Sequence, residues 1–192
     1  MELKEAIYGR RSIRKYKSVP VSDQDIQDIL EAGMMAPSAV NQQPWHFVVV
    51  KSKENIDEII SVMSEASNKL IPSLKQRFPN HPDVVEDTRK FVGMLGNAPL
   101  CILVFLHEPH YNKKESTMIQ SVAAAIQNML LTAYAKGIGS CWLTAPIEAG
   151  ADRILKERFA PDRGDMVALL TFGYAEIEPK APRRKTGRYE II

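Results

Sequence analysis

Apolar residues recur at helical spacing over much of the chain, with polar residues between them. One such helix begins with a capping-box-like pair, Ser22 and Asp25, and ends before Pro37. Residues 115–136 carry a wide apolar stripe with small side chains on a further face, which is typical of a helix buried at the centre of a fold or against a partner subunit. The helices that this spacing predicts cover residues 2–9, 22–36, two or three segments between 54 and 96, 115–136 and 152–159.

Glycine and proline mark several ends of these helices. Gly9 closes the first helix, and since glycine tolerates a positive φ, we expect a left-handed cap there. Pro72, Pro79 and Pro82 interrupt the helical pattern between residues 54 and 96. We therefore expect short helices joined by a mobile surface segment in this part of the chain.

Short apolar runs rich in β-branched residues, each too short for a helix, predict strands. The run at residues 100–106 is the strongest, because Pro99 precedes it and Pro109 follows it. After the last strand, residues 175–192 are rich in proline and basic residues and end in apolar ones, so we expect this tail to dock on the chain's own body or on a neighbour. The predicted strands cover residues 47–50, 100–106, 140–143 and 166–172.

The composition is that of an ordinary globular protein, and we expect a single domain over residues 1–192. The formal net charge of +2 gives no overall excess that would draw the chain onto nucleic acid, so any anion site must be local. No stretch reaches 18 consecutive apolar residues and the N-terminus lacks a signal-peptide pattern, so we expect neither secretion nor a membrane span. Cys101 and Cys141 lie in apolar runs, as buried free thiols do, which favours a cytoplasmic location.

The first segment with candidate chemistry is Arg10-Arg11-Ser12-Ile13-Arg14. Alternate side chains share one side of an extended backbone, so Arg10, Ser12 and Arg14 would present two guanidinium groups around one hydroxyl. Such a set can cradle a phosphate. An arginine-rich pentapeptide taken alone is more often a solvated turn, so this segment by itself is a weak signal.

The second segment is the polar loop APSAVNQQPW at residues 36–45. Its side chains, Ser38, Asn41 and Gln43 among them, offer neutral donors and acceptors that can read the edge of a heteroaromatic ring. The alternative is an ordinary connection from a helix to a strand, with Trp45 in the core.

These two segments, in this order and spacing, resemble the nitroreductase family of FMN-dependent oxidoreductases. GIGSCWL at residues 137–143, the late Phe172-Gly173-Tyr174 and the basic tail around Arg183 look like further landmarks, so the resemblance spans nearly the whole chain and is weakest between residues 54 and 96. It implies an α+β fold with a central, mainly antiparallel sheet flanked by helices. It also implies an intertwined homodimer with two FMN sites at the subunit interface.

The resemblance further implies roles for individual residues. The residues that would bind the FMN phosphate and ribityl chain, with Arg14 also near N1 and C2=O of the ring, are Arg10, Arg11, Ser12, Arg14, Arg183, Arg184 and Lys185. Three residues would come from the second subunit and lie near the ring or its dimethylbenzene end: Pro37, Ser38 and Ala39. Asn41 and Gln43 would hydrogen-bond the ribityl or pyrimidine groups. The segment that would pass flavin N5 is either Leu143, Thr144 and Ala145 or, in a second alignment, Pro146, Ile147 and Glu148.

The activity that the resemblance implies is transfer of hydride from NAD(P)H through FMN to nitroaromatic, quinone or similar acceptors by a ping-pong mechanism, with no protein nucleophile or general base. The same scaffold can host dehalogenation or flavin breakdown. Two other classes stay open: a non-catalytic FMN-binding or FMN-sensing protein, and an anion- or nucleic-acid-binding protein that uses residues 10–14 and 183–188. We expect no metal at His107-Glu108-Pro109-His110, since Pro109 breaks the helix that a metal-binding pair of histidines needs.

Overall fold

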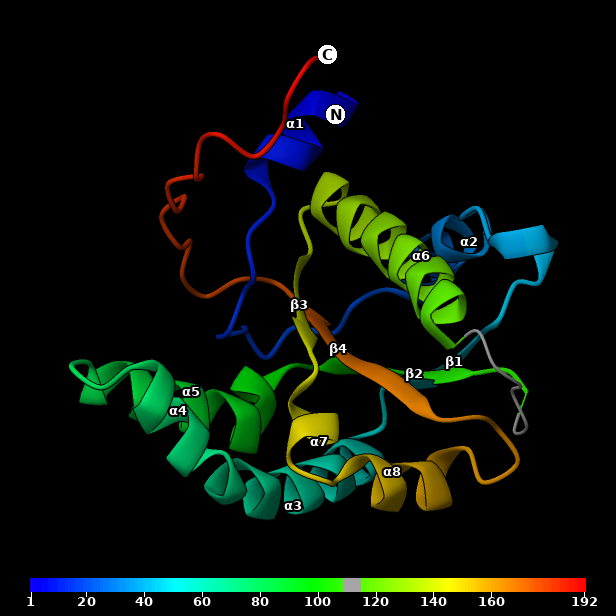
Figure 1. The fold of residues 1–192 in the computed structure, drawn as a ribbon. Helices are drawn as coiled ribbons and strands as arrows, with labels where there is room; N and C mark the ends of the chain where they lie inside the picture. Colours follow the sequence, from blue (N-terminus) through cyan, green and yellow to red (C-terminus); the bar gives the residue numbers. More distant parts are fainter. Residues whose placement is uncertain (109–114) are drawn as a thin grey trace.

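The structure is a computed structural model that describes residues 1–108 and 115–192 (Figure 1). Within these ranges one antiparallel sheet has the strand order β1-β2-β4-β3. The strands are β1 (Trp45–Val50), β2 (Leu100–Leu106), β3 (Gly139–Leu143) and β4 (Met166–Gly173). The α-helices are α1 (Leu3–Gly9), α2 (Asp23–Met34), α3 (Lys53–Lys69), α4 (Ile71–Arg77), α5 (Pro82–Met94), α6 (Glu115–Ala135), α7 (Ala145–Glu148) and α8 (Asp152–Phe159), and two short 3-10 turns are η1 (Ala39–Asn41) and η2 (Leu95–Asn97).

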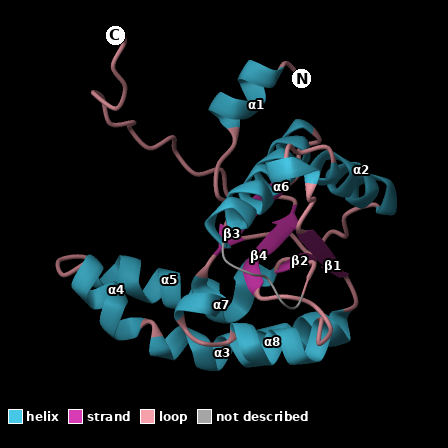
Figure 2. Ribbon diagram, turned by 45° about the vertical axis from the view of Figure 1, so that its right-hand side comes forward, coloured by secondary structure: helices cyan, strands magenta, loops and turns pink. Residues whose placement is uncertain are grey.

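Helices cover both faces of the sheet. Figures 1 and 2 show α2 and α6 on one side and α3, α4, α5, α7 and α8 on the other. Every residue of β2 is buried, and its side chains alternate between the two resulting cores: Ile102 packs with α2 and α6, whereas Leu103 packs with the other helices. Period-two alternation in a strand that is apolar throughout therefore requires cover on both sides.

The predicted α+β architecture with an antiparallel sheet is confirmed. The strand predicted at residues 47–50 begins earlier, at Trp45, because Trp45 and His46 continue the pairing with the end of β2. Helix α7 was not predicted, since four residues are too few for a periodic pattern. The segment between 54 and 96 forms α3, α4 and α5, and α4 and α5 each carry proline in the first turn, where the missing N–H is tolerated.

The prediction of a left-handed cap at Gly9 is wrong. Gly9 is the last residue of α1, and its φ is not positive. A Cβ at this position would lie 2.1 Å from the hydroxyl oxygen of Tyr134 on α6, so glycine here permits the close approach of the two helices. Spacing along α1 contains no information about a neighbour that is more than a hundred residues away.

The turn η2 positions the segment that follows α1. Leu95, Gly96 and Asn97 all have positive φ, at 52°, 61° and 59°. The carbonyl oxygen of Gly96 accepts a hydrogen bond from the backbone N–H of Tyr16 at 3.0 Å, and a Cβ on Gly96 would lie 2.3 Å from the carbonyl oxygen of Arg14. Only glycine fits this contact between backbones, and the contact holds residues 14–16 in place.

The C-terminal tail leaves the body soon after β4. Ala175 bridges to Tyr16, and the Lys15 ammonium lies 2.8 Å from a carboxylate oxygen of Glu176. Beyond this point every residue is exposed, including Ile192 at the end, and Figure 2 shows the tail and α1 projecting on the α6 side. The end of the tail therefore does not dock on the body of its own chain. Within residues 1–108 and 115–192, no helix is long and apolar enough to cross a membrane.

Gly96→Ala should destabilise the protein much more than Gly150→Ala. Both glycines have positive φ, but a Cβ on Gly150 meets nothing within 4 Å. We expect Gly150→Ala to cost about 1–2 kcal/mol and Gly96→Ala about 3 kcal/mol or more in the free energy of unfolding, because only the second adds a backbone clash. Urea unfolding of both variants measures this difference, and equal losses would show that the contact with Arg14 is not tight.

Candidate functional site

The segment from Arg10 to Tyr16 attaches to the outer edge of β3 through Ser12 and Ile13. The backbone N–H of Ile13 donates to the carbonyl oxygen of Ser140 at 2.9 Å, and Ser12 forms a parallel bridge with Ser140. Ile13 and Tyr16 are buried, and the Tyr16 hydroxyl lies 2.8 Å from the hydroxyl of Thr171. Burial of these apolar side chains leaves Arg14 exposed and keeps Arg10 and Ser12 only half-buried.

Arg10, Ser12 and Arg14 gather around one buried thiol. Burial raises the pKa of the Cys141 thiol, while Arg14, a hydrogen bond with Ser12 and then Arg10 act in the opposite direction. The Arg14 guanidinium also lies 5.8 Å from the ring centroid of Phe91 on α5. The segment therefore brings these three side chains to one place, with Arg14 reaching toward α5.

The Arg11 side chain binds backbone carbonyl groups at the end of α1. Its Nη1 donates to the carbonyl oxygens of Tyr8 and Arg10, both at 2.7 Å. Carbonyl groups at the end of a helix lack partners within the helix, so this guanidinium stabilises the end of α1. The side chain of Arg11 is thus already engaged by the backbone.

Arg10 is a half-buried cation without a counter-charge. Within the described part of the chain, its guanidinium has no carboxylate partner and no hydrogen bond. Burial lowers the pKa of Arg10, and the nearby positive charges of Arg184 and Arg11 lower it further. Arg184 comes from the tail, where Arg183 and Lys185 are also exposed. A group of like charges that gathers around a partly desolvated guanidinium favours the binding of an anion.

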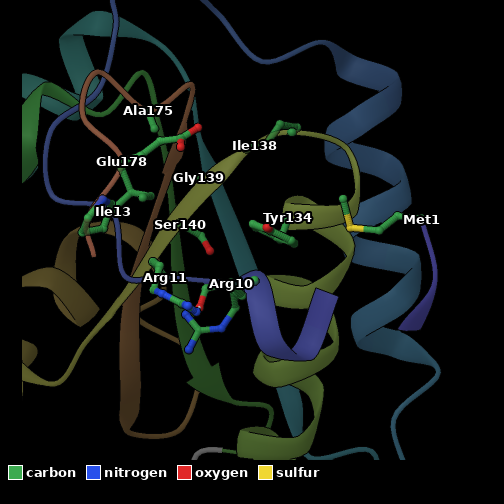
Figure 3. A pocket seen from close by; sticks show the side chains of 13 residues that line it. Met1, Arg10, Arg11, Ile13, Tyr134, Ile138, Gly139, Ser140, Ala175 and Glu178 are labelled. Atoms are coloured by element: carbon green, nitrogen blue, oxygen red, sulfur yellow. The ribbon is translucent and has the colours of Figure 1, made fainter. Parts of the chain in front are cut away.

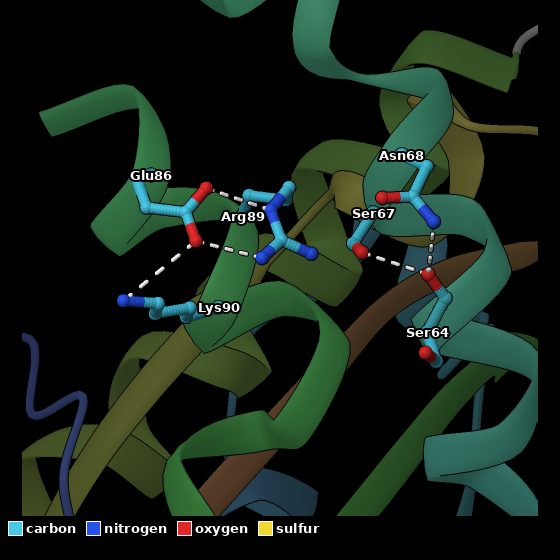
Figure 4. A network of polar contacts seen from close by, with 6 residues as sticks. All are labelled: Ser64, Ser67, Asn68, Glu86, Arg89 and Lys90. Carbon is cyan, nitrogen blue, oxygen red and sulfur yellow. Dashed lines mark hydrogen bonds and ion pairs between the residues drawn. The ribbon is translucent and has the colours of Figure 1, made fainter. Parts of the chain in front are cut away.

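Arg89 on α5 shows the opposite arrangement (Figure 4). Its Nε and Nη2 donate to the two carboxylate oxygens of Glu86 at 2.8 and 2.7 Å, and Lys90 lies 3.6 Å from the same group. The hydrogen bonds from Arg89 lower the pKa of Glu86 to about 2, so the pair persists at neutral pH. Arg89 is therefore neutralised within the protein, whereas Arg10 is not.

A cavity of about 350 Å³ lies beside Arg10, between α1, the end of α6, the start of β3 and the tail (Figure 3). Ser140 lines it with a side chain that is 1% exposed and a hydroxyl that has no hydrogen-bond partner among the described residues. The complete lining is Met1, Gly9, Arg10, Arg11, Ile13, Tyr134, Gly137, Ile138, Gly139, Ser140, Ala175, Glu178 and Pro179. Sequence reasoning did not single out Ser140, although a hydroxyl within a predicted strand of apolar residues is an available signal.

The loop after α2 lies against the other end of α6. The backbone N–H of Ala39 donates to the hydroxyl of Ser121 at 3.2 Å, and Ser38 accepts from the backbone N–H of Gln43 at 3.0 Å. Val40, Asn41 and Gln43 have positive φ, at 51°, 55° and 48°. Positive φ is costly for a β-branched residue, and Val40 is 92% exposed. Pro37, Asn41 and Gln43 are exposed as well.

The two predicted segments therefore do not meet within one chain. Ser121 marks the level of the loop on α6, and Tyr134, which touches Gly9, marks the level of the arginine segment. The two positions are separated by thirteen residues of helix, or about 20 Å.

The segment proposed to pass flavin N5 spans the end of β3 and α7. Leu143 is buried in the core, Thr144 is exposed and precedes α7, and Ala145 begins that helix. The hydroxyl of Thr144 donates to a carboxylate oxygen of Glu148 at 3.0 Å. Both alternatives thus lie on the same short stretch of chain, at the end of β3 and in α7.

No group of three or more potential metal-ligating side chains occurs in the described ranges, 1–108 and 115–192. Of the motif at residues 107–110, His107 and Glu108 are exposed, with Nε2 and Oε1 4.0 Å apart, and Pro109 and His110 lie outside the described residues. Cys101 and Cys141 are free and buried, as the sequence predicts.

Comparisons with known proteins identify the family of this chain. The profile of the Nitroreductase family matches residues 7–174, and the chain belongs to this family. A relative from Archaeoglobus fulgidus, provisionally named as an NADH dehydrogenase/NAD(P)H nitroreductase, is 35% identical over 179 residues, which are 92% of this chain and 87% of the relative. An iodotyrosine deiodinase of Thermotoga neapolitana is 26% identical over 184 residues, which are 95% of this chain and 91% of the relative.

A solved structure gives the same result for the fold. A protein from Desulfovibrio desulfuricans, provisionally described as a nitroreductase and solved in complex with FMN, is similar with a TM-score of 0.75 and 29% identity, covering 100% of this chain and 98% of that one. The resemblance that the sequence motifs indicate is confirmed at the level of the family and of the fold.

Neither thiol should react with Ellman's reagent in the folded protein at pH 7.5. Burial raises the pKa of Cys101 to about 12 and raises that of Cys141 as well, so both stay protonated and inaccessible at this pH. We expect both thiols to react once urea unfolds the chain. Rapid modification of native protein that Cys141→Ala abolishes would show instead that Arg10 and Arg14 activate this thiol.

Proposed function

We propose that this chain is an FMN-dependent oxidoreductase that transfers electrons from NAD(P)H to small conjugated acceptors such as nitroaromatics or quinones. The observation that carries the proposal is the half-buried Arg10 guanidinium, which has no counter-charge among the described residues and lies near Arg184. Family membership and the FMN in the complex of the Desulfovibrio desulfuricans protein support FMN as the anion that Arg10 would bind.

The residues beside the cavity fit the phosphate of FMN. A phosphate monoester carries nearly two negative charges at neutral pH and accepts several hydrogen bonds. Arg10 and Arg184 supply positive charge, and Ser12 supplies a hydroxyl next to them. Arg183 and Lys185 lie on the same exposed tail and can join them. Charge-assisted bonds from guanidinium groups are the strongest phosphate contacts that side chains make.

Bound FMN would supply the hydride chemistry, and the chain would bind it, orient it and stabilise charge. Arg14 is exposed, lies over the Phe91 ring and forms no ion pair within the described part of the chain. Its guanidinium can therefore stabilise negative charge at the pyrimidine end of the flavin. Neither Cys101 nor Cys141 is a nucleophile at neutral pH, because burial raises both pKa values. Chemistry that resides on the cofactor requires no protein nucleophile.

We further propose that two copies of the chain form the active unit. Large apolar side chains are exposed at both ends of α6: Met35 is 82% and Val40 92% exposed near the loop, and Leu3 is 67% and Tyr8 72% exposed on α1. Exposed apolar surface of this extent is typical of a protein interface. An antiparallel pairing about α6 would bring the loop of one copy to the arginine segment of the other, and would give the exposed tail a surface to cover.

A second reaction on the same scaffold has a specific observation in its favour. The relative from Thermotoga neapolitana is named for deiodination of iodotyrosine, and it matches this chain over 95% of its length. Reductive dehalogenation consumes electrons, which a reduced flavin can supply. Iodotyrosine therefore belongs among the acceptors to be tested, and flavin breakdown or FMN storage without turnover remain the alternatives.

Purified protein should bind FMN, and anaerobic NADH or NADPH should bleach its visible absorbance, which a nitroaromatic or quinone then restores. Arg10→Gln should raise the dissociation constant for FMN about 10-fold or more, because one charge-assisted bond to the phosphate is lost. Arg153→Gln, an exposed arginine on α8, is the matched control and should change nothing.

Three outcomes would contradict this proposal in different ways. Bound FMN that NAD(P)H does not reduce would indicate storage or sensing. Reduced flavin that passes electrons to iodotyrosine and not to nitroaromatics or quinones would indicate a dehalogenase. Protein that binds no FMN but binds DNA with an affinity that falls steeply with salt would indicate a nucleic-acid-binding protein.

Mixed dimers test the shared site. An Arg10→Glu chain and an Asn41→Ala/Gln43→Ala chain should each bind FMN poorly as pure dimers. Refolded together, they should yield mixed dimers with one intact site, because one copy supplies a normal arginine segment and the other a normal loop. Equilibrium dialysis should then find about one FMN per two chains in the mixed species. If each site belonged to one chain, mixing would restore nothing.

A further inference from the structure

Ser140 stands apart from the other buried polar side chains of the described residues. Four polar side chains are buried: Ser67, Ser121, Ser140 and Thr171. Ser67 donates to the carbonyl oxygen of Ser64, Ser121 donates to that of Thr117, and Thr171 pairs with the Tyr16 hydroxyl. Ser140 Oγ has no partner, and the only other buried side-chain polar atom of the described residues without one is Nε1 of the half-buried Trp142, which does not line the cavity. A buried hydroxyl without a partner costs free energy, so its persistence indicates a partner that binds from outside the chain.

The free hydroxyl faces the cavity that contains Arg10. Ser140 and Arg10 both line this cavity, and Figure 3 shows the Ser140 oxygen turned toward the open space beside the arginines. Ile13 and Tyr134 form apolar parts of the wall, and Glu178 of the exposed tail contributes one carboxylate. On the protein-body side of the cavity, the side chains of Arg10, Arg11 and Ser140 carry hydrogen-bond donors, which suit an oxyanion.

The backbone of Ser140 holds this hydroxyl in a defined place. Ser140 pairs with Phe172 in the sheet, and its carbonyl oxygen accepts the hydrogen bond from Ile13 at 2.9 Å. The same residue therefore fixes the position of the Arg10–Arg14 segment and offers a hydroxyl next to it. The backbone of this donor is therefore fixed before the ligand binds, and only the groups that cover its buried hydroxyl have to move aside.

We propose that Ser140 Oγ donates a hydrogen bond to a phosphate oxygen of the bound flavin nucleotide and helps the site to select FMN over unphosphorylated riboflavin. This inference rests on the proposed function, since it assumes that FMN occupies the site. Arg10 contributes charge, whereas Ser140 contributes a buried neutral donor that only a phosphorylated flavin satisfies. Sites built from buried polar groups discriminate strongly against ligands that leave those groups unpaired.

Dissociation constants of Ser140→Ala for FMN and for riboflavin, measured by equilibrium dialysis, test the proposal. We expect the FMN constant to rise at least 5-fold and the riboflavin constant to stay within 2-fold of wild type. Ser140→Thr, which keeps the hydroxyl, should retain FMN binding. Ser67→Ala removes an equally buried serine from α3, on the other side of the sheet, and should leave both constants unchanged.

The outcomes separate this inference from the function on which it rests. Wild-type protein that binds no FMN overturns both. Wild-type protein that binds FMN, together with a Ser140→Ala variant of equal FMN affinity, overturns the role of Ser140 alone. A Ser140→Ala variant that loses FMN and riboflavin to the same extent overturns it too, because the hydroxyl would then act on the fold and not on the phosphate.

Discussion

Burial of β2 and β4 on both faces of the sheet is the constraint on which the arrangement of this molecule depends. Every residue of the two strands is buried, so helices must cover both sides. With β3 at the edge of the sheet, an unpaired strand border remains, and the segment from Arg10 to Tyr16 attaches to it through Ser12 and Ile13. The outer edge of β3 thus places the basic segment beside Gly139 and Ser140, and the cavity lies between them.

Charge pairing distinguishes the arginines of the fold from those of the site. Arg89 meets Glu86 within its own helix and Arg11 meets carbonyl groups at the end of α1, so each guanidinium has its partner in the chain. Arg10 lies near two positive charges, Arg184 and Arg11, and has no carboxylate partner among the described residues. Partly buried charge of one sign is unfavourable until a counter-ion arrives, and a phosphate supplies one. The absence of a partner within the described part of the chain therefore distinguishes the arginine of the binding site, because all three residues are of the same type.

Helix α6 sets the distance between the two halves of the proposed flavin site. Its length separates the loop at Ser121 from the arginine segment at Tyr134, and apolar side chains are exposed near both ends. A two-fold axis perpendicular to α6 would place each end of the helix opposite the other end of its partner. Under the proposed dimer, the same surface that buries the exposed side chains would also complete the site.

Much of this protein could be predicted from the sequence, because short-range patterns determine secondary structure. The period of apolar residues located the strands and most of the helices, but it gave only two or three unbounded segments where α3, α4 and α5 lie and it missed α7. The motifs around Arg10 and Asn41 indicated the family. Other features depend on neighbours distant in the chain. Gly9 is required by Tyr134, Gly96 by the backbone of Arg14, and the unpaired state of Ser140 is visible only when every nearby donor and acceptor is in place. Local spacing determines elements and motifs, whereas tertiary packing alone decides which polar groups find partners and which are left for a ligand.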